Sequence, residues 1–279
     1  MQMLSNLGKT TATLGALVLA AGHVVTGVLA ADLSTDPVAA PPPPVNERID
    51  RTWEFLVAPY FVGANITGTS RIGRLPSSDL DIGTSDILEN LRFGAMMRAD
   101  VLYRQKFGLM LDVAYMNLGT ATDTPLTGGR VRVGGSQLIL ETMLFYRAYK
   151  TTQSSIDIYA GGRYWDISLD LDATGTIAGN FDINRGDNWL DPVIGVRAFH
   201  MFNDKWSVSG RGDVGGFGAG SDFSWNAQAG VGYHFNKTWS AHLQYKALSV
   251  DYDNNKSGTA RFAYDTITHG PLIGIAARF

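Results

Sequence analysis

The sequence predicts an all-β fold, a transmembrane antiparallel up-and-down β-barrel of about ten strands, with eight as the alternative. Three observations predict it. The N-terminus has the pattern of a secretory signal, which places the chain outside the cytoplasm. Most later segments alternate apolar and polar residues with the two-residue period of a strand. The chain ends on such a segment, Ile267–Phe279, whose last residue is aromatic.

Composition narrows the function classes. The chain has 279 residues, a formal net charge of −3 and 18% charged residues, below the roughly 25% of soluble domains. No basic stripe is present, so nucleic acid is not an expected partner. The chain has no cysteine, which excludes disulfides, thiol catalysis, cysteine-ligated zinc and a lipid anchor on an N-terminal cysteine. We expect no cofactor and no metal site.

Residues 1–30 are predicted to be a cleaved signal peptide. Lys9 is the positive flank, Leu14–Leu19 begins the apolar region, and Val28–Ala30 is a small-residue cleavage pattern. Residues 31–51 form a proline-rich stretch, which we interpret as a semi-rigid periplasmic linker. Residues 52–279 are predicted to form the barrel. After residue 30 no stretch approaches the ~18 apolar residues of a spanning helix, so any membrane crossing uses strands.

Ten alternating segments follow the linker, and most are roughly 9–13 residues long, enough to span a bilayer when tilted. They are Trp53–Ile66, Leu91–Arg104, Phe107–Leu118, Ser136–Tyr149, Ile156–Leu169, Asn188–Phe202, Trp206–Val214, Phe223–Phe235, Trp239–Ala247 and Ile267–Phe279. In the eighth, for example, Trp225 and Tyr233 share one face while Ser224 and Gln228 share the other.

Connections between the segments alternate between short and long. The long ones are Gly68–Asn90, Gly119–Gly135 and Asp170–Asp187, which we predict to be outward-facing loops. Two short turns repeat one pattern, Phe-Asn-x-x-Trp-Ser, beginning at Phe202 and Phe235. Such a repeat is typical of a meander built from similar hairpins.

Alternation alone does not say which face points inward. A soluble barrel buries its apolar face, whereas a membrane barrel turns it toward lipid. Aromatic residues cluster beside the short turns, where a membrane barrel carries an interfacial girdle. The girdle residues are Tyr103, Phe107, Trp206, Phe235 and Trp239. We therefore expect the apolar faces to meet lipid and the polar faces to line the lumen.

The signal, the proline-rich lead, the alternating strands and the terminal Gly270-Pro271…Arg278-Phe279 together resemble the small bacterial outer-membrane β-barrels of the OmpA-transmembrane, OmpW and opacity-protein kind. The resemblance covers Trp53–Phe279. It implies location in the bacterial outer membrane, with membrane lipid, lipopolysaccharide and the barrel-assembly machinery as partners. It also implies that Phe279 is the assembly signal. The oligomeric state stays open.

The expected lumen is lined by charges of both signs, which should pair because an unpaired buried charge is costly. The predicted inward set is Arg98, Asp100, Arg104, Asp112, Glu141, Arg147, Asp157, Arg163, Asp191, Arg197, Arg211, Asp213, His242 and Lys246. A barrel of about this size is filled by side chains. We therefore expect a mainly structural envelope role. The alternatives are a narrow passive porin and an adhesin or receptor that acts through the long loops.

Two further features were considered for function. Ser85–Leu91 has a helix-start pattern with Asp86 and Glu89, and this helix could constrict the lumen or lie on the surface. No serine follows His242 by two positions, neither His200 nor His269 has an inward serine nearby, and no Gly-x-Ser-x-Gly motif occurs. We predict no catalytic residue and no enzyme activity.

Overall fold

The computed structural model describes residues 52–74, 76–123, 130–176 and 179–279. The predicted signal peptide and linker, residues 1–51, lie outside the described residues. The described chain holds twelve strands, one α-helix and one 3₁₀ turn. The elements are β1 (Trp53–Val62), β2 (Asn65–Ile72), β3 (Ser78–Ile82), α1 (Thr84–Asn90), β4 (Leu91–Tyr103), β5 (Phe107–Asp123), β6 (Arg130–Lys150), β7 (Ser154–Thr176), β8 (Gly179–Met201), β9 (Trp206–Gly215), β10 (Phe223–His234), β11 (Trp239–Asp253), η1 (Gly258–Ala260) and β12 (Phe262–Arg278).

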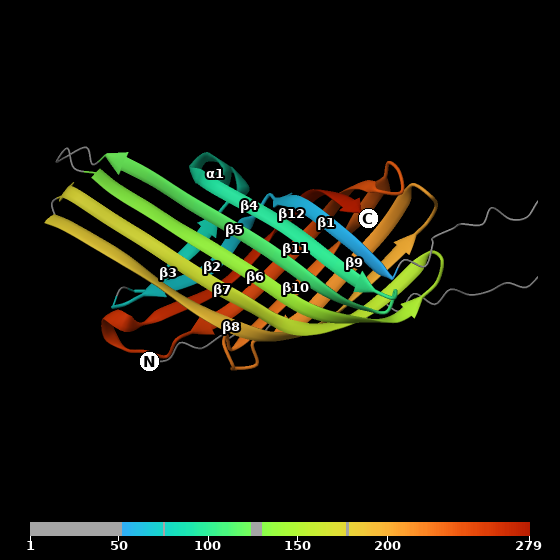
Figure 1. Cartoon of the computed structure of the whole chain (residues 1–279). Helices are drawn as coiled ribbons and strands as arrows, with labels where there is room; N and C mark the ends of the chain where they lie inside the picture. The colour runs from blue at the N-terminus through green and yellow to red at the C-terminus, as the bar shows by residue number, and fades with distance from the viewer. Residues whose placement is uncertain (1–51, 75, 124–129, 177–178) are drawn as a thin grey trace, which may run out of the picture. The chain divides into compact units, whose positions relative to one another are not determined.

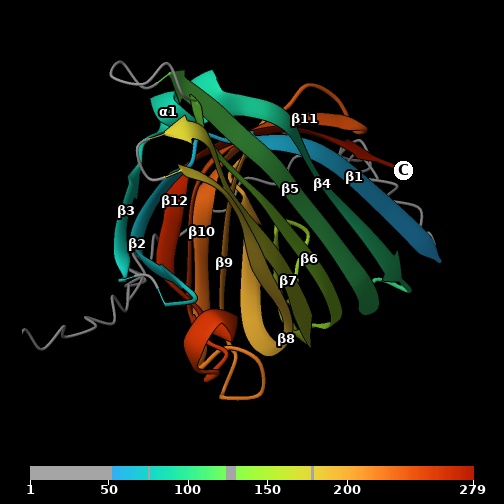
Figure 2. The ribbon, with the colours of Figure 1, turned by 90° about the vertical axis from the view of Figure 1, so that its left-hand side faces the viewer.

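Ten of these strands close an antiparallel barrel (Figures 1 and 2). β4 to β12 follow one another around the sheet, and β1 pairs with β4 on one side and with β12 on the other. The closing seam joins Leu56 to Arg278 and Val62 to Leu272. The backbones of Phe55 and Phe279 complete it with reciprocal hydrogen bonds of 3.2 and 2.9 Å. The prediction of a ten-stranded closed barrel is confirmed.

The other two strands extend one side of the barrel. β2 pairs with the first half of β12, from Phe262 to His269, while β1 pairs with its second half. The two therefore run along β12 in succession, and β3 pairs with the outer edge of β2. The predicted first strand, Trp53–Ile66, is in fact divided at residues 63–64 between β1 and β2.

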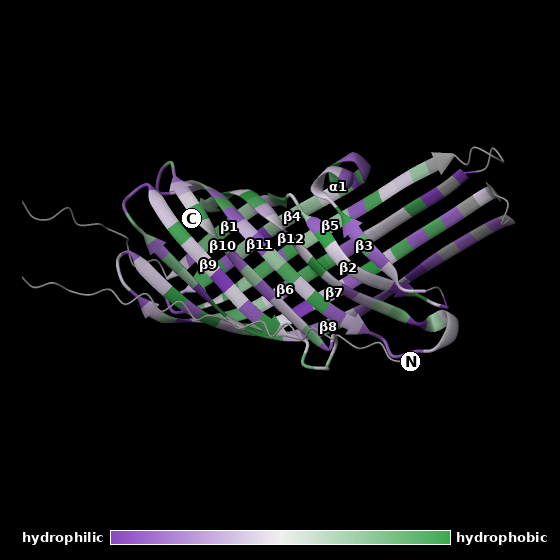
Figure 3. Cartoon of the chain, turned by 180° about the vertical axis from the view of Figure 1, so that it is seen from behind, coloured by the Kyte–Doolittle hydropathy of each residue, from purple (hydrophilic) through white to green (hydrophobic). Residues whose placement is uncertain are grey.

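The barrel is inverted relative to a soluble one. Its outward-facing side chains are apolar and exposed, as Leu144, Ile194 and Ile273 illustrate at 69%, 51% and 61% of their surface. The inward faces of the strands hold buried charged side chains, among them Glu141 and Arg163. Figure 3 shows hydrophobic and hydrophilic residues alternating along the strands of the barrel.

Two rings of outward aromatic side chains bound this apolar wall. The ring beside the short turns contains Trp53, Tyr103, Phe107, Phe202, Trp206, Phe235, Trp239 and Phe279. The second ring contains Phe61, Phe93, Tyr115, Tyr164, Phe223, Trp225 and Tyr245. Ten residue steps separate Phe93 from Tyr103 on β4, which is roughly 33 Å along the strand and roughly 25 Å of height once tilted. We call the wall between the rings the outer apolar band.

The repeated short turns adopt the same geometry. The Asn203 side chain accepts hydrogen bonds from the backbone N–H groups of Lys205 and Trp206 at 2.9 and 3.0 Å. Asn236 accepts the equivalent pair from Thr238 and Trp239, both at 2.8 Å. Each asparagine fixes the turn through its own side chain. We call this end of the barrel, where β1 begins and β12 ends, the short-turn end, and the opposite one the far end.

The expected long loops are largely ordered strands. β5 to β8 run well past the outer apolar band toward the far end, with pairing that extends to Asp123–Arg130 and Thr176–Gly179 (Figure 1). Gly68–Asn90 contains most of β2, all of β3 and all of α1. The prediction of loops was wrong because polar residues on both faces are compatible with a strand as well as with a loop. Beyond a bilayer, both faces of a strand can meet water.

The predicted helix is present but does not cross the lumen. α1 begins after Gly83, whose N–H donates to the Asp86 carboxylate at 3.1 Å, so Asp86 and not Glu89 supplies the capping contact. Its one buried residue, Ile87, packs with Val62 and Met116. α1 lies beside the barrel wall between β3 and β5 (Figure 2). Among the described residues, no helix is long and apolar enough to cross a membrane.

Candidate functional site

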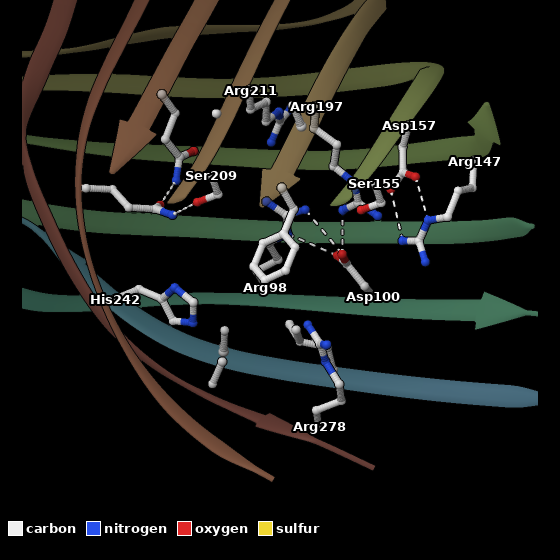
Figure 4. Close-up of a pocket in the computed structure, with 18 of the residues that line it drawn as sticks. Arg98, Asp100, Arg147, Ser155, Asp157, Arg197, Ser209, Arg211, His242 and Arg278 are labelled. Carbon is white, nitrogen blue, oxygen red and sulfur yellow. Dashed lines mark hydrogen bonds and ion pairs between the residues drawn. The ribbon is translucent and has the colours of Figure 1, made fainter. Parts of the chain in front are cut away.

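The candidate site is the interior of the barrel, beginning with a cavity at the short-turn end. The cavity has a volume of about 220 Å³. Gln105 and the turn residues Thr151 and Gln153 line it, so it opens at the short-turn end. Asp112 and Arg211 line its deep end. Figure 4 shows arginines and aspartates from several strands pointing into this space.

A chain of ion pairs, here called the cavity network, lines one side of the cavity. Arg98 binds Asp100 two residues away on β4, with Nε–Oδ1 at 3.0 Å. Asp100 also accepts from Arg197 on β8 at 2.5 Å, although β4 and β8 are not neighbouring strands. Arg197 continues to Asp157 at 2.8 Å, and Asp157 binds Arg147 at 2.8 Å. The cavity network therefore braces the barrel across its lumen.

A second group of charges, here called the buried layer, lies deeper. The Arg163 guanidinium donates to Glu141 at 2.7 Å and to Asp213 at 2.6 Å. Arg211 donates to the other Glu141 oxygen at 2.7 Å and to Asp213 at 3.2 Å. These four side chains are between 0% and 4% exposed. Two cations and two carboxylates balance, which a water-excluded interior requires.

Some of these ion pairs follow the sheet register, since Arg163 lies directly opposite Glu141 and Arg147 directly opposite Asp157, and others cross it. In the sheet register, Asp112 lies directly opposite Glu141 and Arg197 directly opposite Arg211, so neighbouring strands place like charges side by side. Like charges directly opposite are destabilising. Arg197 turns instead to Asp100 and Asp157, while Arg211 turns to carboxylates of the buried layer. Of the carboxylates that Arg197 and Arg211 bind, only Asp157 lies directly opposite its arginine in the sheet register.

The ion pairs include nine of the fourteen predicted inward residues. Asp191 accepts from the Trp165 indole at 3.0 Å and from the Ser221 backbone and hydroxyl at 2.7 and 2.8 Å. Asp112 accepts from the Tyr60 hydroxyl at 2.6 Å. Including Asp191 in a charge network was wrong, because its partners among the described residues are neutral donors.

Three cationic members also differ from expectation. Lys246 has no carboxylate within ion-pair distance among the described residues, and its Nζ lies 6.0 Å from the Tyr60 ring centroid. His242 contacts the Ser240 hydroxyl at 2.9 Å. Arg104 is in the turn between β4 and β5, with its guanidinium 5.2 Å from the ring centroid of Tyr103.

Sequence reasoning missed an aromatic cluster that fills the lumen beyond the buried layer. The Trp189 ring stacks on Tyr252 at 3.7 Å and on Trp165 at 5.7 Å between centroids. The full cluster, here called the aromatic plug, is Ile139, Trp165, Ile167, Trp189, Leu248, Val250, Tyr252, Phe262 and Tyr264. Strict alternation along β7 and β8 would have placed Trp165 and Trp189 inward.

Histidine contacts were also incompletely predicted. Three serine–histidine hydrogen bonds are present, Ser154–His200 at 2.8 Å, Ser207–His234 at 3.0 Å and Ser240–His242 at 2.9 Å. Two of these pairs join neighbouring strands, and in the third the serine precedes its histidine, so none has a serine two positions after the histidine in sequence. In the described ranges no group of three acidic or histidine side chains is placed to hold a metal ion.

Comparisons with known proteins bear on the fold. No protein-family model and no curated protein matches the sequence. Among solved structures, the outer membrane protease OmpT from Escherichia coli matches with a TM-score of 0.53 and 8% identity, over 81% of this chain and 97% of that one. The translocator domain of the autotransporter NalP from Neisseria meningitidis gives 0.39 and 14%, over 82% and 90%. Ail, the attachment invasion locus protein of Yersinia pestis, gives 0.31 and 10%, over 82% and 99%.

At 8% identity, the OmpT match shows a shared barrel architecture and carries no information about activity. The narrower resemblance to the OmpA-transmembrane, OmpW and opacity-protein group has no support from these matches.

Proposed function

We propose that the chain is an integral outer-membrane β-barrel protein with a mainly structural role in the bacterial envelope. The observation that carries the proposal is the inverted wall. Exposed apolar side chains cover the barrel between two aromatic rings, while charged side chains are buried inside. In water such a wall would be an aggregation hazard. In a bilayer it is the expected surface.

The filled lumen favours a structural role over transport. The buried layer and the aromatic plug lie between the cavity and the far end, and most of their side chains are less than 9% exposed. No described feature favours the porin alternative. Planar-bilayer recordings separate the two functions, since a filled lumen gives no conductance above that of the lipid. Reproducible conductance steps from the pure protein would contradict the proposal.

The proposed orientation follows from the ends of the chain. β1 begins and β12 ends at the short-turn end, so a periplasmic linker would put that end in the periplasm and the extension of β5 to β8 outside. The proposed partners are membrane lipid, lipopolysaccharide and the barrel-assembly machinery. The adhesin alternative would use the outer strand extension, and a variant without residues 119–134 would test it in surface-binding assays.

Replacing Ile194 by arginine tests the membrane assignment. Ile194 is 51% exposed in the middle of the β8 part of the outer apolar band. An arginine facing lipid near the midplane costs about 2–4 kcal/mol. We expect Ile194→Arg to lower the unfolding free energy in lipid vesicles by that amount, measured by urea titration. The same substitution on a water-facing barrel wall would cost almost nothing.

Asn184→Arg is the matched control for Ile194→Arg. It lies on the same outward face of β8 but beyond the band, in the projecting part of the strand. We expect a change of about 0–1 kcal/mol there, as for charges near the interface. Equal effects at the two positions would show that the band does not contact lipid.

Phe279 is proposed to be the assembly signal. Its backbone forms two hydrogen bonds with Phe55 across the closing seam, while its ring is exposed. Phe279→Ala keeps the backbone hydrogen bonds and removes only the ring. We expect this variant to accumulate less folded barrel in cells than any variant that lacks one lumen charge. Heat-modifiable gel migration of membrane fractions measures this, and normal assembly of Phe279→Ala would contradict the role.

A further inference from the structure

We propose that the cavity at the short-turn end is a binding site for a small oxyanion that carries phosphate or carboxylate groups. This goes beyond the structural role, because a barrel needs no ligand site to serve it. The site lies on the lumen face of β8 to β11, at the deep end of the cavity. Its central residues are Arg211, Gln228 and Lys246.

The charge of the cavity lining is the first argument. Seven cationic side chains line it, Arg98, Arg147, Lys150, Arg197, Arg211, Lys246 and Arg278, against the four carboxylates of Glu54, Asp100, Asp112 and Asp157. Arg211 is balanced by the buried layer, whose carboxylates do not line the cavity. When Arg211 is left out of the count, six cationic side chains and four carboxylates line the cavity. The cavity therefore has an excess of two positive charges, in a partly enclosed space that strengthens attraction for an anion.

Unused donors are the second argument. Arg211 Nη1 has no hydrogen-bond partner but is buried and not exposed to the cavity, so other parts of the Arg211 side chain line the cavity. The Lys246 ammonium also has no ion-pair partner among the described residues, while the nearby Asp112 carboxylate is held by the Tyr60 hydroxyl. An unsatisfied buried donor is uncommon in a native protein and calls for an explanation. An anion at the deep end of the cavity would pair with the Lys246 ammonium, and the nearby Arg211 would add positive charge.

Register brings these donors together. Gln228 lies directly opposite Arg211 on β9 and directly opposite Lys246 on β11. Arg211 and Lys246 are therefore two strand spacings apart, roughly 10 Å between backbones, a gap that two long side chains can close around one small anion. Gln228 lies between them, and its amide nitrogen donates to Gln244. Figure 4 shows that the labelled Arg211, Ser209 and His242 border the same space.

The test is isothermal titration calorimetry on the full chain folded in detergent, with inorganic pyrophosphate and citrate as probes at fixed ionic strength. We expect saturable binding of one anion per chain. Binding of pyrophosphate alone would identify a phosphate site, binding of citrate alone a carboxylate site, and binding of both a general oxyanion site. Absence of saturable binding of either probe would overturn the proposal.

Two variants locate the site. Lys246→Gln removes the unpaired cation, and Gln228→Glu adds a carboxylate between Arg211 and Lys246 without removing any cation. Both are expected to weaken binding at least ~10-fold, a loss of one charge-assisted contact. Lys237→Gln, in the exposed turn after β10, is the control and should bind as the unmodified chain does. Unchanged affinity in both cavity variants would overturn the assignment.

Heat-modifiable migration of each variant shows that it is folded before titration. Because binding is measured in detergent, its failure leaves the membrane assignment intact, and failure of the Ile194→Arg test leaves the anion site intact.

Discussion

Arg163→Met is expected to destabilise the barrel by about 3–5 kcal/mol, the cost of removing one partner from a buried ion pair. The Arg163 side chain is 0% exposed and donates to Glu141 and Asp213 from the centre of the buried layer. Its loss leaves two carboxylates with Arg211 as their one remaining cation in that layer. Methionine fills much of the same space, so the loss reflects charge more than packing. Urea unfolding in lipid vesicles, followed by tryptophan fluorescence, measures the change.

Arg132→Met is the matched control, because Arg132 on β6 pairs with Asp172 on β7, the strand pair that also holds Glu141 and Arg163. This ion pair is 3.3 Å long, and its side chains are 54% and 39% exposed. Exposed pairs contribute about 0–1 kcal/mol. A cost for Arg163→Met as small as that of the control would mean that water reaches the layer. The lumen would then be open enough to revive the porin alternative.

Trp189→Ala is expected to cost about 3–5 kcal/mol, the range for large aromatic residues truncated in a core. Trp189 is 6% exposed and lies between Trp165 and Tyr252 at the centre of the aromatic plug. Truncation removes both stacking contacts and leaves a cavity that rigid strands cannot close. The urea titration used for Arg163→Met measures the loss.

Two further substitutions separate the reasons for the Trp189 effect. Its indole Nε1 is buried without a hydrogen-bond partner, so Trp189→Phe should cost well under half as much as Trp189→Ala. Leu190→Ala changes the next residue, which points outward and is 59% exposed, and should cost less than about 1.5 kcal/mol because no core cavity forms. Similar losses for Trp189→Ala and Leu190→Ala would mean that the plug does not stabilise the fold.

The sequence by itself determined the fold class and the face of each barrel strand. Alternation has a period of two, and a slip by one residue would exchange every lumen and wall side chain. The positions of Arg98, Glu141 and Ile194 therefore followed from counting. The repeated turn at Asn203 and Asn236 could also be predicted from the sequence, because each asparagine accepts hydrogen bonds from backbone groups only two and three residues away.

Only the tertiary structure decided which charges meet and what fills the lumen. Some ion pairs join residues directly opposite in the sheet, such as Glu141 and Arg163, but closure of the barrel brings Asp100 of β4 to Arg197 of β8 across the lumen, and no sequence period encodes that contact. Within the described part of the chain, Lys246 has no carboxylate at ion-pair distance, and Asp191 is surrounded by neutral donors. The aromatic plug is also a tertiary feature: alternation puts Trp165 and Trp189 on the inward face, but only the closed barrel stacks Trp189 on Tyr252 of β11.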